Sequence, residues 1–176
     1  MKDGMRVSDR VARISKSAIH EMTRLSKEVD DVAFLSWAKP TSDTPQHIKD
    51  GAIAAIKKGL VGGYSENAGL LKLREEIVRK LKRDNNIDAN PAQILVTVGA
   101  IEGLSAAIMA LIDPGDEVIL PSPTYSTHIR QVVIASGKPV LVPSIEEEGF
   151  IWDIDGVKKA ITDKTRAIMY LSLIHI

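Results

Sequence analysis

Two patterns of apolar residues divide the chain, and the change from one to the other comes near Pro91. In the first part, apolar positions recur among polar ones at the three- and four-residue spacing of amphipathic helices. This spacing predicts a helix from Asp9 to Glu28, with Ser8 as its N-cap. The apolar face of that helix would carry Val11, Ile14, Ala18, Met22 and Leu25.

Two more amphipathic helices are predicted before the pattern changes. The segment QHIKDGAIAAIKKG follows Thr44 and Pro45, which suit the N-cap and first helical positions, and it ends at Gly59. The segment LLKLREEIVRKLKRDN forms the next helix and has a strongly basic outer face. The glycine-rich stretch VGGYSENAG between them is predicted to be a loop.

Beyond Pro91, short runs that are apolar throughout alternate with helical segments. Strands without two-residue alternation are typical of a parallel sheet that is covered on both faces. The alternation therefore predicts an α/β domain with a largely parallel sheet and right-handed crossovers. The expected strands are ILVTV, EVIL, PVLV and RAIMYL, and the expected helices are AIEGLSAAIMALI, TYSTHIRQVVIAS and DGVKKAI, the last capped by Asp153.

Composition narrows the classes of function. Lysine plus arginine and aspartate plus glutamate both number 23, and this balance gives no long-range field to hold nucleic acid or an acidic membrane. The chain contains no cysteine, which excludes disulfides, thiolate metal sites and a cysteine nucleophile. Its charged N-terminal segment lacks the apolar core of a signal peptide, and no apolar run approaches membrane-spanning length. A cytoplasmic location is the expectation.

The junction between ILVTV and the helix after it is the first candidate site. Gly99, Ala100 and Ile101 lie where a strand meets a helix N-terminus, at the sheet edge where ligands bind in open α/β folds. Small residues and helix N–H groups there suit a phosphate. The alternative is that Gly99 only makes a tight turn.

Tyr125 is the second candidate. It closes the proline-rich stretch PSPTY at the end of the next strand, where an aromatic ring could stack on a flat cofactor. The alternative is a tyrosine packed against its own helix.

Other motifs in the sequence give weaker evidence for a functional site. VGGYSEN comes close to a nucleophile elbow, but Asn67 replaces the last glycine and no strand precedes the serine. The dinucleotide fingerprint and the P-loop pattern do not occur. The four histidines have no metal-ligand spacing, so no metal is predicted, and they are interpreted as surface or packing residues: His20, His47, His128 and His175.

Taken together, GYSENAGLLKLREEI, ILVTVGAIEGL and DPGDEVILPSPTY resemble, in this order and spacing, the class I/II aminotransferases, which are fold type I enzymes that use pyridoxal 5'-phosphate. The resemblance extends from the N-terminal arm to Leu171. It implies a helical arm and small-domain segment over residues 1–60, followed by part of the large domain with its mainly parallel sheet over residues 61–171.

The resemblance also implies roles for individual residues. Gly99, Ala100 and Ile101 would bind the cofactor phosphate, and Tyr125 would stack on the cofactor ring. Tyr64 would reach the phosphate of the other subunit of a homodimer. Ala38 stands where the family usually has a glycine beside the substrate carboxylate, and its methyl group would crowd that region.

The catalytic part of the family pattern does not occur in this chain. In the family, the lysine that forms a Schiff base with the cofactor lies beyond the last residue of this sequence. Lys57, Lys58, Lys158 and Lys159 are interpreted as solvated positions on helices. The chain therefore resembles an N-terminal aminotransferase fragment, which alone would be inactive. Residues 172–176 are expected to be a non-native tail, because LSLIHI replaces the Asn-Pro-rich turn of the family.

The resemblance leaves the reaction open. The expected activity is transfer of an amino group from an amino acid to a 2-oxo acid. Two alternatives remain, a fold type I lyase or decarboxylase that uses the same cofactor, and a non-catalytic aminotransferase-like domain of a regulator.

Overall fold

The computed structural model describes residues 6–14, 18–33, 35 and 41–171. These residues form two compact units. The sheet unit comprises Met1–Ala18 and Gly99–Ile176, and the helical unit comprises Ile19–Val98. The predicted domains, residues 1–60 and 61–171, stay a prediction, and residues 172–176 lie outside the described part.

The N-terminal helix is shorter than its apolar pattern predicts. Helix α1 covers only Asp9–Ala12, and α2 covers Ala18–Ser26. Residues 13 and 14 are not helical. The prediction of one continuous helix is therefore wrong. The α-helical hydrogen-bond pattern ends there, because the Ile14 N–H donates to the Val11 carbonyl, only three residues back, at 3.1 Å. Helix α1 packs against helix α6 (Ser126–Ile134).

The helical unit contains α3 (Gln46–Lys57), α4 (Leu71–Asn85) and the short 3₁₀ helix η1 (Pro91–Gln93). Pro45 is the N-cap of α3, with ψ 142°, so the prediction of Thr44 as the N-cap is wrong by one residue. Gly59, with φ +70°, follows the end of α3.

A buried arginine joins α4 to the loop before it and to η1. The guanidinium of Arg74 on α4 donates to the carbonyls of Gly69 and Pro91, both at 3.0 Å, and forms an ion pair with Glu66 at 2.5 Å. Gly69 itself has φ +93°, and a Cβ there would lie 2.5 Å from a Val96 methyl group. The loop 66–69 is therefore fixed to α4 and η1 by polar contacts that only glycine at 69 permits.

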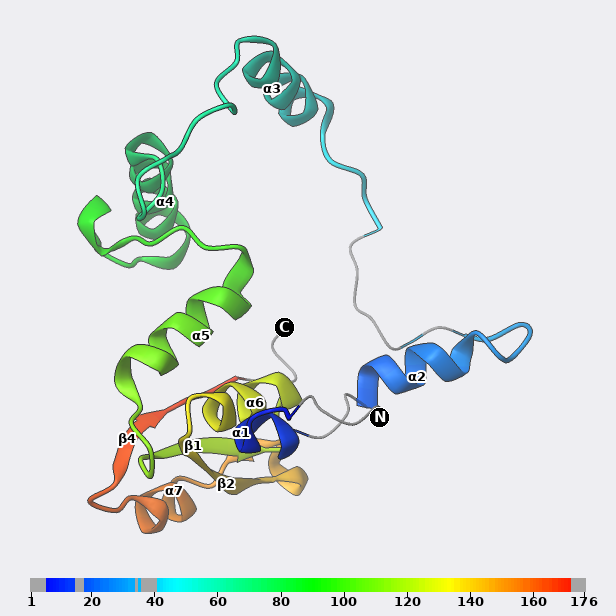
Figure 1. The fold of residues 1–176 in the computed structure, drawn as a ribbon, viewed down its shortest axis with the longest axis vertical. Helices are drawn as coiled ribbons and strands as arrows, with labels where there is room; N and C mark the ends of the chain where they lie inside the picture. The colour runs from blue at the N-terminus through cyan, green and yellow to red at the C-terminus, as the bar shows by residue number, and fades with distance from the viewer. Residues whose placement is uncertain (1–5, 15–17, 34, 36–40, 172–176) are drawn as a thin grey trace. The chain divides into compact units, whose positions relative to one another are not determined.

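In the described residues, the sheet unit has four strands in the order β3-β2-β1-β4, and Figure 1 labels β2, β1 and β4. Strands β2 and β4 run parallel to β1, and β3 is antiparallel to β2. This confirms the predicted mainly parallel α/β fold. The bounds are β1 Glu117–Ser122, β2 Lys138–Ile145, β3 Ile151–Trp152, β4 Thr165–Ile168, α5 Gly99–Leu111, α6 Ser126–Ile134, α7 Ile154–Ala160, and 3₁₀ helix η2 Glu146–Glu148.

The predicted strand ILVTV is not a strand in the structure. Ile94 has extended backbone angles, φ −103° and ψ 127°, and the Val96 N–H donates to the Ala68 carbonyl at 3.0 Å. No sheet ladder in the described residues includes this segment. An apolar run that favours extended backbone becomes a strand only when a neighbouring strand supplies a ladder of hydrogen bonds.

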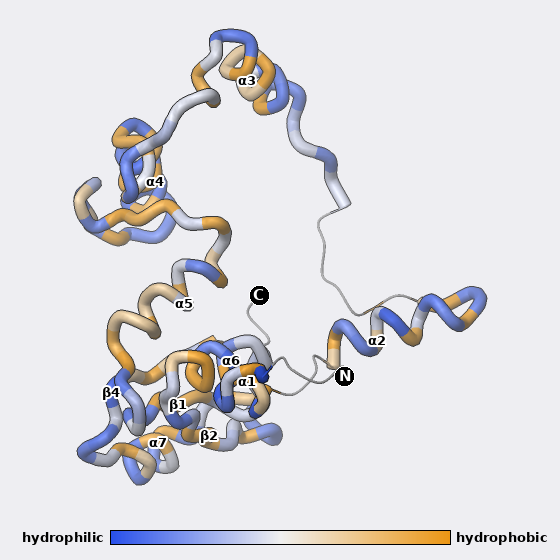
Figure 2. The backbone as a smooth tube through the Cα atoms, viewed as in Figure 1, coloured by the Kyte–Doolittle hydropathy of each residue, from blue (hydrophilic) through white to orange (hydrophobic). Residues whose placement is uncertain are grey.

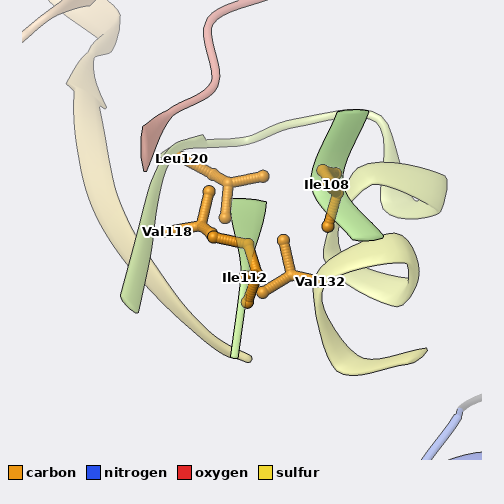
Figure 3. Close-up of a cluster of buried hydrophobic side chains, with 5 residues drawn as sticks. All are labelled: Ile108, Ile112, Val118, Leu120 and Val132. Atoms are coloured by element: carbon orange, nitrogen blue, oxygen red, sulfur yellow. The ribbon is translucent and has the colours of Figure 1, made fainter. Parts of the chain in front are cut away.

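Strand β1 is the core of the sheet unit. Val118 and Leu120 point to one face, where they pack with Ile108 of α5, Ile112 just after it, and Val132 of α6 (Figure 3). Ile119 points to the other face and meets β2 and α7 in a second cluster. The expectation that both faces are covered is correct for β1. It is wrong for the other two parallel strands, where Leu141 and Ile168 are about half exposed.

Polar contacts fix the start of β1. The Asp113–Asp116 turn closes with a backbone hydrogen bond of 3.1 Å, and Gly115 supplies its positive φ of +97°. The buried carboxylate of Glu117 then accepts hydrogen bonds from Lys138 at 2.9 Å and Thr162 at 2.7 Å. These two contacts lower the pKa of Glu117. The side chains thus join β1 to the start of β2 and to the segment just before β4.

Many large apolar side chains are exposed in the described residues. Leu35 and Val98 are about nine-tenths exposed, and hydrophobic positions are spread along α2, α3 and α4 (Figure 2). Of the helices that the described ranges contain, none combines the length and the apolar character needed to cross a bilayer.

The 176-residue chain, purified alone, is therefore expected to self-associate. Exposed apolar surface and the unpaired side of edge strand β4 both favour contacts with other chains. Size-exclusion chromatography with light scattering measures the association. Ile168→Lys, a charge on the exposed edge strand, is expected to reduce it. A monodisperse wild-type monomer that melts cooperatively would contradict the prediction.

Candidate functional site

Helix α5 begins at Gly99, so the predicted glycine–helix junction is present although the strand before it is not. Gly99 has φ +75°, a conformation that other residues rarely adopt. A Cβ on Gly99 would meet no atom within 4 Å. Ala100 and Ile101 are exposed as well. Residues 99–102, the first turn of this 13-residue helix, are therefore exposed in the described chain.

Tyr125 is the N-cap of α6 and lies three residues beyond the end of β1, after a cis Ser122–Pro123 peptide bond. Its half-buried ring meets the ring of His128 edge-on, with centroids 5.5 Å apart and planes at 89°. The structure thus shows the contact with its own helix that one interpretation expected. Stacking of Tyr125 on a cofactor stays a prediction.

His128 lies inside the protein. It is 5% exposed, and burial lowers the pKa of its imidazole, which favours the neutral form. Its Nδ1 has no hydrogen-bond partner in the described residues. This confirms that His128 is a packing residue, and the packing is against Tyr125.

Gln131 is a buried residue that the sequence analysis missed. Its Nε2 donates to the Ile101 carbonyl and to Ser105 Oγ, both at 2.9 Å. Ser105 Oγ in turn donates to the Ile101 carbonyl at 2.8 Å. These contacts tie α6 to the first turn of α5. Tyr125, His128 and Gln131 are spaced by three residues, so the sequence could have placed them on one side of α6. That spacing does not identify the Ile101 carbonyl, thirty residues away, as the acceptor for Gln131.

Two predicted site residues lie outside the described part of the sheet unit. The side chain of Tyr64 is fully exposed and belongs to the helical unit. Ala38 lies outside the described residues. Their predicted roles stay predictions.

The remaining candidates behave as surface groups. Lys57, Lys58, Lys158 and Lys159 are all exposed, as expected for solvated positions on helices. Ser65 lies in a loop and follows no strand in the described residues, so nothing in the structure supports a nucleophile elbow there.

Comparison with known proteins gives a consistent result. The family model described as aminotransferase class I and II matches residues 31–173. An aspartate aminotransferase of Pyrococcus abyssi is 40% identical over 166 residues, and an aromatic-amino-acid aminotransferase of Thermococcus litoralis is 38% identical over the same length. Each match covers 94% of this chain and 42% of the relative. The chain thus spans about two-fifths of the length of these relatives.

Solved structures agree. Thermus thermophilus aspartate aminotransferase with maleate matches with a TM-score of 0.85 and 36% identity, over 93% of this chain and 44% of that one. An alanine aminotransferase from Pyrococcus furiosus matches with a TM-score of 0.84 and 36% identity, over 93% of this chain and 43% of that one.

Proposed function

The chain belongs to the class I and II aminotransferases, and on that premise we propose that the full-length protein moves an amino group from an amino acid to a 2-oxo acid. The observation that carries the proposal is the match over 94% of the chain to relatives named as aminotransferases. The start of α5 and the position of Tyr125 support it independently, because both suit the cofactor that such a reaction uses.

Pyridoxal 5'-phosphate is the proposed cofactor, and the described residues fit it. The open first turn of α5 offers a helix N-terminus with no side chain at Gly99, which suits a phosphate group. Tyr125 offers an aromatic ring at the start of α6. When bound, the cofactor supplies an electron sink for the carbanion formed at the substrate α-carbon. In this proposal Gly99, Ala100 and Ile101 bind the phosphate, and Tyr125 orients the ring.

The remaining groups that the proposed reaction needs are not among the residues at the starts of α5 and α6. We propose that Tyr64 binds the phosphate of the partner subunit in a homodimer, and its side chain is fully exposed in the described chain. Ala38 is proposed to lie beside the substrate carboxylate. The lysine that holds the cofactor and moves the substrate proton is expected outside these 176 residues. A cytoplasmic location stays part of the proposal.

The proposed reaction is tested by direct assay. The full-length protein, loaded with pyridoxal 5'-phosphate, is incubated with an amino acid and a 2-oxo acid, and both new products are measured by chromatography. Stoichiometric amino transfer is expected, whereas the 176-residue chain alone is expected to give none, because its candidate lysines are surface groups. Release of ammonia or carbon dioxide without amino transfer would favour a lyase or a decarboxylase instead.

Gly99→Val in the full-length protein is expected to weaken binding of pyridoxal 5'-phosphate about tenfold, because the side chain would block hydrogen bonds from the helix start to a charged group. Titration of the apoenzyme, followed by absorbance, measures the affinity. Gly115→Val is the control, since Gly115 also has a positive φ with open space around its Cβ position, but lies in the turn before β1. Equal affinities in the two variants would contradict the phosphate assignment.

Mixed dimers test whether Tyr64 acts across the subunit interface. A Tyr64→Phe subunit is paired with a subunit that lacks the cofactor-binding lysine. If the site is shared, one of the two sites in the hybrid has neither lesion, and amino transfer returns. If verified heterodimers stay as inactive as the parents, Tyr64 does not act in the partner's site.

A further inference from the structure

We propose that Gln131 is a positioning residue for the cofactor site, because its buried amide holds the Ile101 carbonyl and fixes the first turn of α5 against α6. The inference rests on the function proposed above, which assigns the cofactor phosphate to that turn. The proposed phosphate and ring contacts lie on two different helices. Their spacing therefore depends on what joins α5 to α6.

The hydrogen bonds fix the orientation of the Gln131 amide. The Ile101 carbonyl can only accept, so the group that faces it at 2.9 Å must be the NH₂ end. Ser105 Oγ already donates its hydrogen to Ile101, so it accepts from Gln131. One amide thus donates to two groups in the first two turns of α5. Since the peptide unit is planar, holding this carbonyl also orients the backbone that begins the helix.

The other end of the amide argues against a purely structural role. Gln131 is 5% exposed, and its Oε1 has no hydrogen-bond partner in the described residues. A buried unpaired acceptor disfavours folding, whereas an apolar side chain of similar size at this position would remove that cost. The Ile101 carbonyl would still accept from Ser105 without Gln131. A contribution to stability therefore does not explain why position 131 is a glutamine. The hydrogen bond by which it links α6 to α5 does explain it.

The polar contact complements an apolar one further along the same helices. Val132, the next residue on α6, packs with Ile108 and Ile112 in the cluster of Figure 3. Ile108 lies seven residues beyond Ile101, which is about 10 Å along a helix. The apolar contact sets the distance between the helices near the end of α5. The Gln131 contact sets it at the start, where the phosphate would bind.

This division of roles predicts a specific defect. Without Gln131, the first turn of α5 loses its link to α6, while the core around Val132 and the ring of Tyr125 stay in place. The contact with the phosphate should weaken, and the contact with the pyridine ring should not. Pyridoxal, which lacks the phosphate, is the probe that separates the two.

The experiment compares the affinities of full-length apoenzyme variants for pyridoxal 5'-phosphate and for pyridoxal, by absorbance titration. Gln131→Leu is expected to bind pyridoxal 5'-phosphate about fivefold more weakly and pyridoxal as the wild type does, with an unchanged melting temperature. Tyr125→Ala is expected to lose affinity for both compounds, and Tyr125→Phe for neither. Val132→Ala, the matched packing control, is expected to lower the melting temperature and to leave the ratio of the two affinities unchanged.

The outcomes distinguish this inference from the proposed function. If the wild type binds neither compound, the proposed function is wrong, and the inference falls with it. If the wild type prefers pyridoxal 5'-phosphate and Gln131→Leu keeps the same preference, the role of Gln131 is refuted and the function stands. Equal losses for both compounds in Gln131→Leu would show a general structural role, which also overturns the inference.

Discussion

Burial of β1 on both faces is the constraint on which the sheet unit depends. Its alternating side chains enter two separate apolar clusters, with Val118 and Leu120 on one face and Ile119 on the other. A strand enclosed in this way cannot shift its register by one residue without exchanging its two faces. The strand therefore fixes β2 and β4 beside it, and it fixes the place from which the chain continues to Tyr125. The Glu117 carboxylate reinforces this register at the start of the strand.

The candidate site depends on that core indirectly. Helices α5 and α6 share one apolar cluster over β1, and only their first residues reach the proposed cofactor contacts. Apolar packing is not directional, so it holds the two helices together without specifying how their ends are oriented. The directional contact is the hydrogen bond from Gln131 to the Ile101 carbonyl. A rigid site on two helices needs both kinds of contact. In this structure the hydrogen bond lies at the start of α5, and the apolar cluster lies near its end.

The helical unit is organised around a buried polar group instead of an apolar cluster. None of its apolar residues is fully buried in the described part, and the buried group there is the guanidinium of Arg74. Three acceptors contact that guanidinium, and one of them, the Glu66 carboxylate, balances its charge. The loop that follows Tyr64 is thereby held by polar contacts to α4, while Tyr64 itself stays exposed.

The sequence by itself determined the type and order of most elements and the family. Apolar periodicity located α3 and α4, and the alternation of apolar runs with helical segments located α5 and the three parallel strands, because each segment carries its own local signal. The glycine at 99 marked the start of α5, because few other residues adopt its backbone conformation. Motif order identified the family before any contact was known.

Tertiary structure decided the rest, for a common physical reason. The run ILVTV has the composition of a strand, yet pairing requires a neighbour, and the described residues give it none. The predicted N-terminal helix ends at Ala12, where the Ile14 N–H donates to the Val11 carbonyl, and apolar periodicity does not reveal this local turn. The roles of Arg74 and Gln131 depend on acceptors up to thirty residues away along the chain. A sequence pattern encodes which surfaces a segment can bury, whereas the partner that covers each surface is chosen only when the chain folds.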